Sequence, residues 1–334
     1  MDDLTDPDRT KPGPTGTDPT APGPAEPGPA GPVRRPGRGA VAGSAAARPH
    51  VAWALPGIVF FALFAVVPLA LAVALSFCTW NGLDSPAPAG LANWTRLLKD
   101  HDFGQAARLS LLLTTISWAF QTPVALLLGV WAAGRQRSRA VLSAVFFVPL
   151  LLSTTAIAML FHALLDPNFG VIEEIGPWIG IDPGVLGSST GALLTVAFVG
   201  GWQFMPFHTL IYQGGARQIP EVLYQAAAID GAGMLRQFFH ITLPQLRHTV
   251  TTSSVLMIVG SLTYFDTVLI MTKGGPGTDT TILPYLMYRT GFQTYDLGYA
   301  AAIATALVVV ATALSLVLVR FSGFGSMRST REGM

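Results

Sequence analysis

Charged residues are scarce in this chain of 334 amino acids. Only 12% of the residues are Asp, Glu, Lys or Arg, well below the roughly 25% that is usual in soluble globular domains. Hydrophobic residues make up 51%, and 20 basic against 19 acidic side chains leave a formal net charge of +1. This composition excludes an ordinary soluble protein and predicts that most of the chain lies at membrane depth.

Cysteine is limited to Cys78, which excludes an intrachain disulfide and a metal site built from several thiolates. The histidines are scattered without a carboxylate-backed pair at helical spacing, so no metal site is predicted. No G-x-x-x-x-G-K-[ST] phosphate loop or G-x-S-x-G elbow occurs. We therefore expect no catalytic residues, no ATP hydrolysis and no cofactor bound by the chain itself.

Residues 1–50 differ in composition from the rest of the chain. They hold eleven of the 25 prolines and almost no large apolar side chain, which predicts a disordered Pro/Gly-rich tail. The pair Arg34-Arg35 raises the alternative of a twin-arginine export signal. Pro-Gly-Arg follows where an apolar core should begin, so a basic cytoplasmic tail is favoured.

Long apolar runs make up most of the remaining chain. Each has the roughly 20 residues that a helix needs to cross a hydrocarbon core of ~30 Å. The runs are residues 51–77, 107–133, 141–165, 191–212, 249–271 and 299–321. They predict an all-α polytopic membrane protein with six transmembrane helices: a first helix in 51–80, an external loop in 81–106, a five-helix domain in 107–321 and a C-terminal tail in 322–334.

Arginine and lysine predict the orientation of these helices. If the N-terminal tail is inside, the inner segments carry fifteen basic residues and the outer segments five. Without the tail the bias is still nine to five. Positive residues favour the cytoplasmic side of a membrane. We therefore predict that the chain crosses the plasma membrane and that both termini and the polar segment 217–247 lie in the cytoplasm.

The polar segment between the fourth and fifth runs is longer than a simple connection requires. Pro220 suits a first helical position, and Glu221 places a negative charge in the first turn. The helix should run through Ile229 and stop at Asp230-Gly231, because glycine readily adopts a left-handed conformation there. A second short helix should follow over residues 234–241. Two helices joined by a hinge indicate a surface that another protein contacts.

The same segment resembles a known motif. Gln225-Ala226-Ala227, then Ile229-Asp230-Gly231-Ala232, Ile241 and Leu243-Pro244, are similar to the cytoplasmic EAA loop of permease subunits of binding-protein-dependent ATP-binding cassette importers. In that family the loop forms a coupling helix that docks on the ATPase. The resemblance implies the type I ABC importer permease fold. It also implies ATPase coupling through Glu221, Gln225, Ala226, Ala227, Asp230, Gly231 and Ala232.

The motif departs from the family pattern at one position. Gln225 stands where the family usually has glutamate, and an amide cannot make the charge-assisted bond of a carboxylate. Glu221 lies one turn earlier on the same helical face. Our hypothesis is that Glu221 substitutes for the missing charge.

Other stretches resemble the carbohydrate-importer permeases of the maltose and glycerol-3-phosphate type. They include Trp80-Asn81-Gly82, Asp166-Pro167-Asn168-Phe169-Gly170, Trp202-Gln203 and Lys273-Gly274-Gly275-Pro276-Gly277. The resemblance implies a sugar, polyol or oligosaccharide substrate delivered by an external solute-binding protein. It also implies a second permease subunit and two cytoplasmic ATPase subunits that use ATP and Mg; no nucleic acid is expected.

The translocation path has five candidate residues, Trp202, Gln203, Tyr264, Phe265 and Asp266. An unpaired carboxylate costs on the order of 3 kcal/mol at the bilayer centre and less near the interface. Asp266 therefore either braces helix packing or accepts hydrogen bonds from a hydroxylated substrate. The aromatic residues either pack in the bundle or stack on a sugar. Gly274, Gly275 and Pro276 predict a tight external turn.

Two other classes of function remain as alternatives. An ion-gradient-driven secondary transporter would show charges in the middle of several spans or paired halves with broken helices, and Asp266 alone gives this weak support. A polytopic membrane enzyme is disfavoured because no catalytic constellation is visible.

Overall fold

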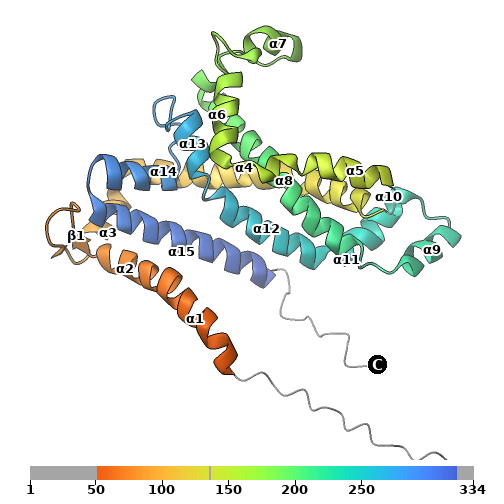
Figure 1. The fold of residues 1–334 in the computed structure, drawn as a ribbon, viewed down its shortest axis with the longest axis horizontal. Helices are drawn as coiled ribbons and strands as arrows, with labels where there is room; N and C mark the ends of the chain where they lie inside the picture. Colours follow the sequence, from red (N-terminus) through yellow and green to blue (C-terminus); the bar gives the residue numbers. More distant parts are fainter. Residues whose placement is uncertain (1–50, 135–136, 322–334) are drawn as a thin grey trace, which may run out of the picture. The chain divides into compact units, whose positions relative to one another are not determined.

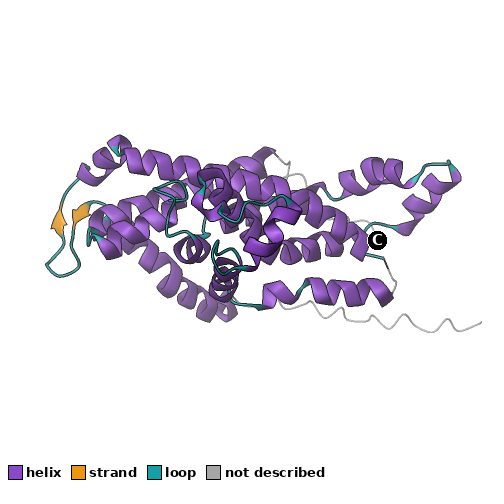
Figure 2. Cartoon of the chain, turned by 90° about the horizontal axis from the view of Figure 1, so that it is seen from above, coloured by secondary structure: helices purple, strands orange, loops and turns teal. Residues whose placement is uncertain are grey.

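The computed structural model describes residues 51–134 and 137–321. The predicted tails 1–50 and 322–334 lie outside the described residues. The chain divides into residues 1–56 and 57–334, and the contacts discussed below all lie within the second unit. Figure 1 shows its helices coloured in chain order, and the helices and strands are distinguished by colour in Figure 2.

The first predicted run is helical but interrupted. It comprises η1 (Val51–Ala54), α1 (Leu55–Phe61), a π-helical turn η2 (Ala62–Val66) and α2 (Val67–Leu75). Pro68 has no backbone N–H to donate. In the π turn just before it, the N–H of Val67 donates to the carbonyl of Ala62, five residues earlier. No side chain of α1 or α2 is buried in this chain, and α2 contacts α15.

The loop that follows the first run packs around a buried asparagine. β1 (Cys78–Thr79) pairs antiparallel with β2 (Ala87–Pro88), and α3 (Ala92–Lys99) follows. Asn93 donates from Nδ2 to the carbonyls of Ser76 and Cys78 at 3.0 and 2.8 Å. These bonds anchor α3 to the outer end of the first run.

A second set of contacts joins this loop to the start of the last span. Arg96 pairs with Asp296 at 2.6 Å, and its guanidinium lies 3.9 Å from the ring centroid of Tyr299. The hydroxyl of Tyr299 donates to Asp100 at 2.5 Å. We call these four residues the outer clamp. Nearby, Arg289 pairs with Asp102 at 3.0 Å.

Two long helices form the centre of the bundle. α4 (His101–Ala132) and α8 (Ser189–Ala216) lie side by side along most of their length (Figure 1). Apolar side chains fill the space between them at several levels. Leu113 packs with Val196 and Ala197 near the outer end, and Ala125 packs with Met205 and Tyr212 further along.

The third predicted run is broken near its middle. α5 (Arg137–Phe146) is followed by the 3-10 turn η3 (Val148–Leu151), which contains Pro149, and by α6 (Thr154–Leu164). Proline cannot continue an α-helical ladder, which explains the break. α7 (Val171–Ile179) and η4 (Val185–Gly187) then lead into α8. The turn between α6 and α7 holds Asp166. The pKa of Asp166 is lowered because its carboxylate accepts backbone hydrogen bonds from Asn168 and Phe169.

The last third of the described chain contains a bent span. The polar segment forms α9 (Glu221–Ile229), α10 (Met234–Gln237), the π turn η5 (Phe238–Thr242) and α11 (Leu243–Gln245). α12 (Arg247–Ser261) and α13 (Phe265–Met271) meet at an angle of 41°. α14 (Leu283–Tyr288), η6 (Arg289–Gln293) and α15 (Leu297–Phe321) complete the sequence of elements.

All six predicted runs are helical, although they differ in length and apolarity. Within the described residues, three continuous helices are long and apolar enough to cross a membrane: 55–75, 101–132 and 297–320. The bent pair α12 and α13 adds a fourth if it counts as one span. α8 has 28 residues but includes buried polar side chains such as Gln203, His208 and Gln213. The fold is therefore an all-α membrane bundle whose apolar core also holds buried polar side chains.

Candidate functional site

Helix α9 ends as the sequence predicts and begins one residue later than expected. Pro220 has φ −60° and ψ 129°, so it caps the helix instead of occupying its first turn. Gly231 has φ +73°. The N–H of Ala232 donates to the carbonyl of Ala227 at 2.8 Å, and the N–H of Gly231 donates to that of Ala228 at 3.0 Å. This pair of bonds is a Schellman motif, which gives α9 a defined end.

Two side-chain hydrogen bonds link α9 and the hinge after it to the chain that follows. The hydroxyls of Tyr224 and Thr242 are 2.9 Å apart, and Thr242 is buried. Gln237 donates from Nε2 to the carbonyl of Ala232 at 2.8 Å. A displacement of α9 would therefore be passed to η5 and to the start of α12.

The polar segment exposes apolar side chains that the bundle does not cover. The exposed fractions are 68% for Val222, 87% for Ile229, 87% for Met234, 77% for Leu235 and 59% for Phe239. We call these five residues the coupling surface. Apolar side chains gathered on one exposed segment are typical of a protein contact site.

The predicted coupling residues lie on or beside this surface. Glu221, Gln225, Ala226, Asp230 and Gly231 are exposed, whereas Ala227 and Ala232 are half-buried. In the part of the chain that the structure describes, neither the side chain of Glu221 nor that of Gln225 forms a hydrogen bond or ion pair.

A cavity of about 840 Å³ lies beside the start of α9, between the ends of α4 and α8. Glu221, Arg217 and Tyr224 are among the residues that line it, and Gln225 is not. Glu221 thus faces a recess between helices, and Gln225 lies outside that recess.

A second cavity, of about 320 Å³, lies at the bend between α12 and α13, and we call it the path cavity. It brings together three of the predicted path residues, Tyr264, Phe265 and Asp266. The remaining lining comes from α6, α8, α12 and the link between α12 and α13: Thr154, Phe204, Phe207, His208, Leu256, Met257, Gly260 and Thr263.

Aromatic rings and hydrogen bonds hold the wall of the path cavity. Phe204 and Tyr264 are stacked, with ring centroids 6.1 Å apart and an interplanar angle of 15°. Gln121 donates from Nε2 to the hydroxyl of Tyr264 at 3.3 Å. Asp266 is exposed in the first turn of α13, where the helix dipole favours a carboxylate.

Trp202 and Gln203 do not line the path cavity. The ring of Trp202 meets that of Phe161 edge-on at 5.5 Å. Gln203 is buried and donates from Nε2 to the carbonyl of Leu152 and to the hydroxyl of Thr154, both at 3.2 Å. Both residues therefore brace α6 against α8, and Gln203 contacts the lining residue Thr154.

Sequence reasoning missed His208, Phe204 and Phe207 as lining residues. His208 is buried, and its Nδ1 lies 3.0 Å from the hydroxyl of Ser253. The available signal was a histidine at membrane depth, which favours a functional role.

The glycine-rich loop around Gly274 is a tight turn attached to both central helices. Gly274 has φ +83°, and a Cβ there would lie 2.6 Å from Thr281 Oγ1 and 2.6 Å from the ring of Tyr285. The Thr280 hydroxyl donates to the carbonyl of Gly275 at 2.7 Å. Gln105 on α4 donates to the Thr278 hydroxyl at 3.0 Å, and Ser189 on α8 donates to Asp279.

Comparisons with known proteins agree with this architecture. The family model described as "Binding-protein-dependent transport system inner membrane component" matches residues 125–324. The "Probable ABC transporter permease protein YurN" of Bacillus subtilis (strain 168) is 34% identical over 274 residues, which are 80% of this chain and 93% of that protein.

A second relative and a solved structure extend the comparison. The "Multiple sugar-binding transport system permease protein MsmF" of Streptococcus mutans is 28% identical over 274 residues, covering 78% of this chain and 93% of that protein. A chain of a bacterial ABC transporter involved in the import of the acidic polysaccharide alginate has a TM-score of 0.71 at 23% identity. The match covers 83% of this chain and 95% of that chain and shows a shared fold.

Proposed function

Since the chain belongs to the family of binding-protein-dependent transport system inner membrane components, we propose that it is the permease subunit of an ATP-driven sugar importer. One observation carries the proposal. The exposed helix α9 connects, through the bond between Tyr224 and Thr242, to the same span whose bend forms the path cavity. A force applied at α9 therefore reaches the proposed substrate path through a short, defined route.

The path cavity has the chemistry that a hydroxylated substrate requires. The stacked rings of Phe204 and Tyr264 offer apolar faces for a sugar ring, and the carboxylate of Asp266 accepts hydrogen bonds from hydroxyl groups. A carboxylate at membrane depth favours a role in transport. The names of the Streptococcus mutans relative and of the alginate transporter point to the same substrate class.

The coupling surface fits a cytoplasmic ATPase as its partner. We propose two such ATPase subunits, which bind ATP and Mg, because this sequence has no phosphate loop of its own. Docking would bury Val222, Ile229 and the neighbouring apolar side chains of the coupling surface. Gln225, Ala226 and Ala227 would then approach the ATPase closely, since two of the three side chains are small.

The remaining partners and the orientation follow from the family and from charge. The family description names a binding protein, so we infer an external solute-binding protein that delivers the sugar and a second permease subunit that completes the path. We infer that both termini lie in the cytoplasm, because this orientation puts fifteen basic residues on the inner side and five on the outer side.

Uptake by the complete transporter in proteoliposomes tests this proposal. With the cognate binding protein outside, a panel of labelled sugars should enter only when ATP is supplied on the ATPase side. An ionophore should have no effect. Uptake that continues without the ATPase, or that stops only with an ionophore, would instead support a secondary transporter.

A further inference from the structure

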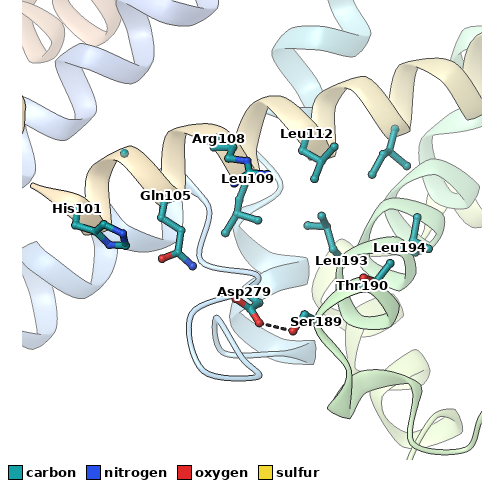
Figure 3. A pocket seen from close by; sticks show the side chains of 12 residues that line it. His101, Gln105, Arg108, Leu109, Leu112, Ser189, Thr190, Leu193, Leu194 and Asp279 are labelled. Atoms are coloured by element: carbon teal, nitrogen blue, oxygen red, sulfur yellow. Dashed lines mark hydrogen bonds between the residues drawn. The ribbon is translucent and has the colours of Figure 1, made fainter.

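A third cavity, of about 740 Å³, opens between the outer ends of α4 and α8 beside Asp279 of the glycine-rich loop (Figure 3). We call it the outer cavity. It shares no lining residue with the path cavity. Its polar lining residues lie at the starts of the two helices, and its apolar lining residues lie further along them. This arrangement suits a ligand with one polar end and one apolar end.

Polar side chains gather at the outer end of this cavity. His101, Gln105 and Arg108 come from the start of α4, Ser189 and Thr190 from the start of α8, and Asp279 from the loop (Figure 3). The predicted spans begin at residues 107 and 191. This end of the cavity therefore lies at the depth of lipid headgroups.

Aliphatic side chains form the deeper wall. Leu109, Leu112 and Ile116 are spaced by three and four residues and so share one face of α4. Leu193 and Leu194 come from α8, and Figure 3 shows Leu112 and Leu193 between the two helices. Leu112 and Leu194 are 43% and 47% exposed, so the wall is open on one side. No Phe, Tyr or Trp ring lines this cavity, unlike the path cavity, so its deeper wall suits a hydrocarbon chain better than a sugar.

The charges at the outer end are not neutralised within the described residues. Of the three outer arginines, Arg96 and Arg289 form ion pairs, whereas Arg108 forms none. Asp279 is held by a hydrogen bond from Ser189 to Oδ2 (Figure 3), with no cation paired to it. One cation and one anion thus line the same cavity without pairing with each other.

We propose that the outer cavity binds one phospholipid of the outer leaflet that has a zwitterionic phosphate–ammonium headgroup. The phosphate binds Arg108, the ammonium group binds Asp279, and one acyl chain lies along Leu109, Leu112 and Ile116. The charge pattern and the depth of the aliphatic wall both match this ligand. The site depends on the membrane orientation given above and is independent of the transported sugar.

Lipid retention by the complete transporter tests this site. The complex is placed in nanodiscs that contain equal amounts of phosphatidylethanolamine and phosphatidylglycerol with identical acyl chains, and tightly held lipid is counted by native mass spectrometry. Because Asp279 repels an anionic headgroup and pairs with an ammonium group, phosphatidylethanolamine should be retained about tenfold better at one position.

Variants separate the headgroup contacts from the acyl contacts. Arg108→Gln should lower retention of both lipids about tenfold, since a charge-assisted bond to phosphate is lost. Arg108→Lys should largely preserve it. Asp279→Asn keeps a polar partner for Ser189 and should abolish the preference between the two lipids. Leu112→Trp should reduce retention of both because the ring fills part of the wall.

Lys99→Gln is the matched control, because Lys99 is another exposed outer cation but lies outside the cavity. Its lipid retention should equal that of the unmodified complex. Equal retention of the two lipids by the unmodified complex, or equal effects of Arg108→Gln and Lys99→Gln, would overturn the proposal. A crosslink from Leu194→Cys to the second permease would also overturn it, since protein would then cover this face.

Discussion

At the scale of single residues, the charge at the start of the coupling motif has the sharpest consequence. Gln225 is exposed and neutral, and Glu221 faces a recess that it shares with Arg217. If Glu221 supplies the carboxylate that the motif lacks, Glu221→Gln should reduce ATP-driven uptake about tenfold, the effect of losing one charge-assisted hydrogen bond. This loss is measured by comparing sugar uptake and ATPase activity of the reconstituted complex with and without the substitution.

A second substitution tests whether the lost carboxylate is the cause. Gln225→Glu introduced into the Glu221→Gln background should restore uptake, because it returns the carboxylate to the position usual in the family. Unchanged coupling in Glu221→Gln alone would show that Glu221 does not compensate for Gln225.

Asp266 separates the two roles that the sequence left open. Asp266→Asn keeps the size of the side chain and removes the charge, so a role in substrate binding predicts at least a several-fold loss of uptake with unchanged abundance in the membrane. Trp202→Phe is the control, since Trp202 packs on Phe161 outside the path cavity. Equal uptake by both variants would favour a packing role for Asp266.

The residues of the path cavity show which site residues could be predicted from the sequence. Tyr264, Phe265 and Asp266 are consecutive, so any bend near them places all three at one cavity. Trp202 and Gln203 were predicted from the chemistry of their side chains, which gives no information about the direction in which α8 presents them. His208 faces the cavity instead, and only the packing of α8 against α12 determines that.

At the scale of elements, the end of α9 depends on a backbone conformation. Proline fixes φ near −65°, which is incompatible with φ +73° at Gly231. Gly231→Pro should therefore disrupt the Schellman motif and uncouple ATP hydrolysis from uptake, while the protein remains in the membrane. Comparing the two rates in proteoliposomes gives the coupling ratio.

Gly233 offers a matched control for this substitution. It has φ −68° and ψ 168°, values that proline adopts. Gly233→Pro should therefore preserve coupling. Normal transport by Gly231→Pro would count against a coupling role for the end of α9.

The link between α9 and the fifth span is testable by a double-mutant cycle. Tyr224→Phe and Thr242→Val each remove one hydroxyl of a pair 2.9 Å apart. Each should weaken coupling by about 1 kcal/mol, and the double variant should be no worse than either single one. Strictly additive losses would indicate that the two hydroxyl groups act separately.

Sequence patterns predicted elements better than the bends within them. The break at Pro149 and the stop at Gly231 follow from residues with restricted or unusual backbone preferences. The 41° bend between α12 and α13 contains no proline. Near it, the Thr263 hydroxyl bonds to the carbonyls of Gly260 and Val259 at 2.9 and 3.3 Å, a local competition with the helix that a sequence alone does not reveal.

At the scale of the whole molecule, the sequence predicted the order of the helical runs, but only three continuous helices and one bent pair among the described residues have the length and apolarity of a membrane span. It did not predict that the first run buries no side chain within this chain. Either lipid or another subunit can cover an apolar helix surface, so hydropathy does not show which of the two contacts the first run. The neighbours of this helix depend on the assembled transporter.

The outer clamp has a consequence for how motion in this protein is to be measured. Arg96, Asp100, Asp296 and Tyr299 fasten the first external loop to the start of α15 through an ion pair, a ring contact and a short hydrogen bond. The bend that forms the path cavity lies elsewhere, between α12 and α13. We therefore expect the clamped region to serve as a reference for distance measurements, in which probes attached there and on α9 or α13 report the displacement of those two helices.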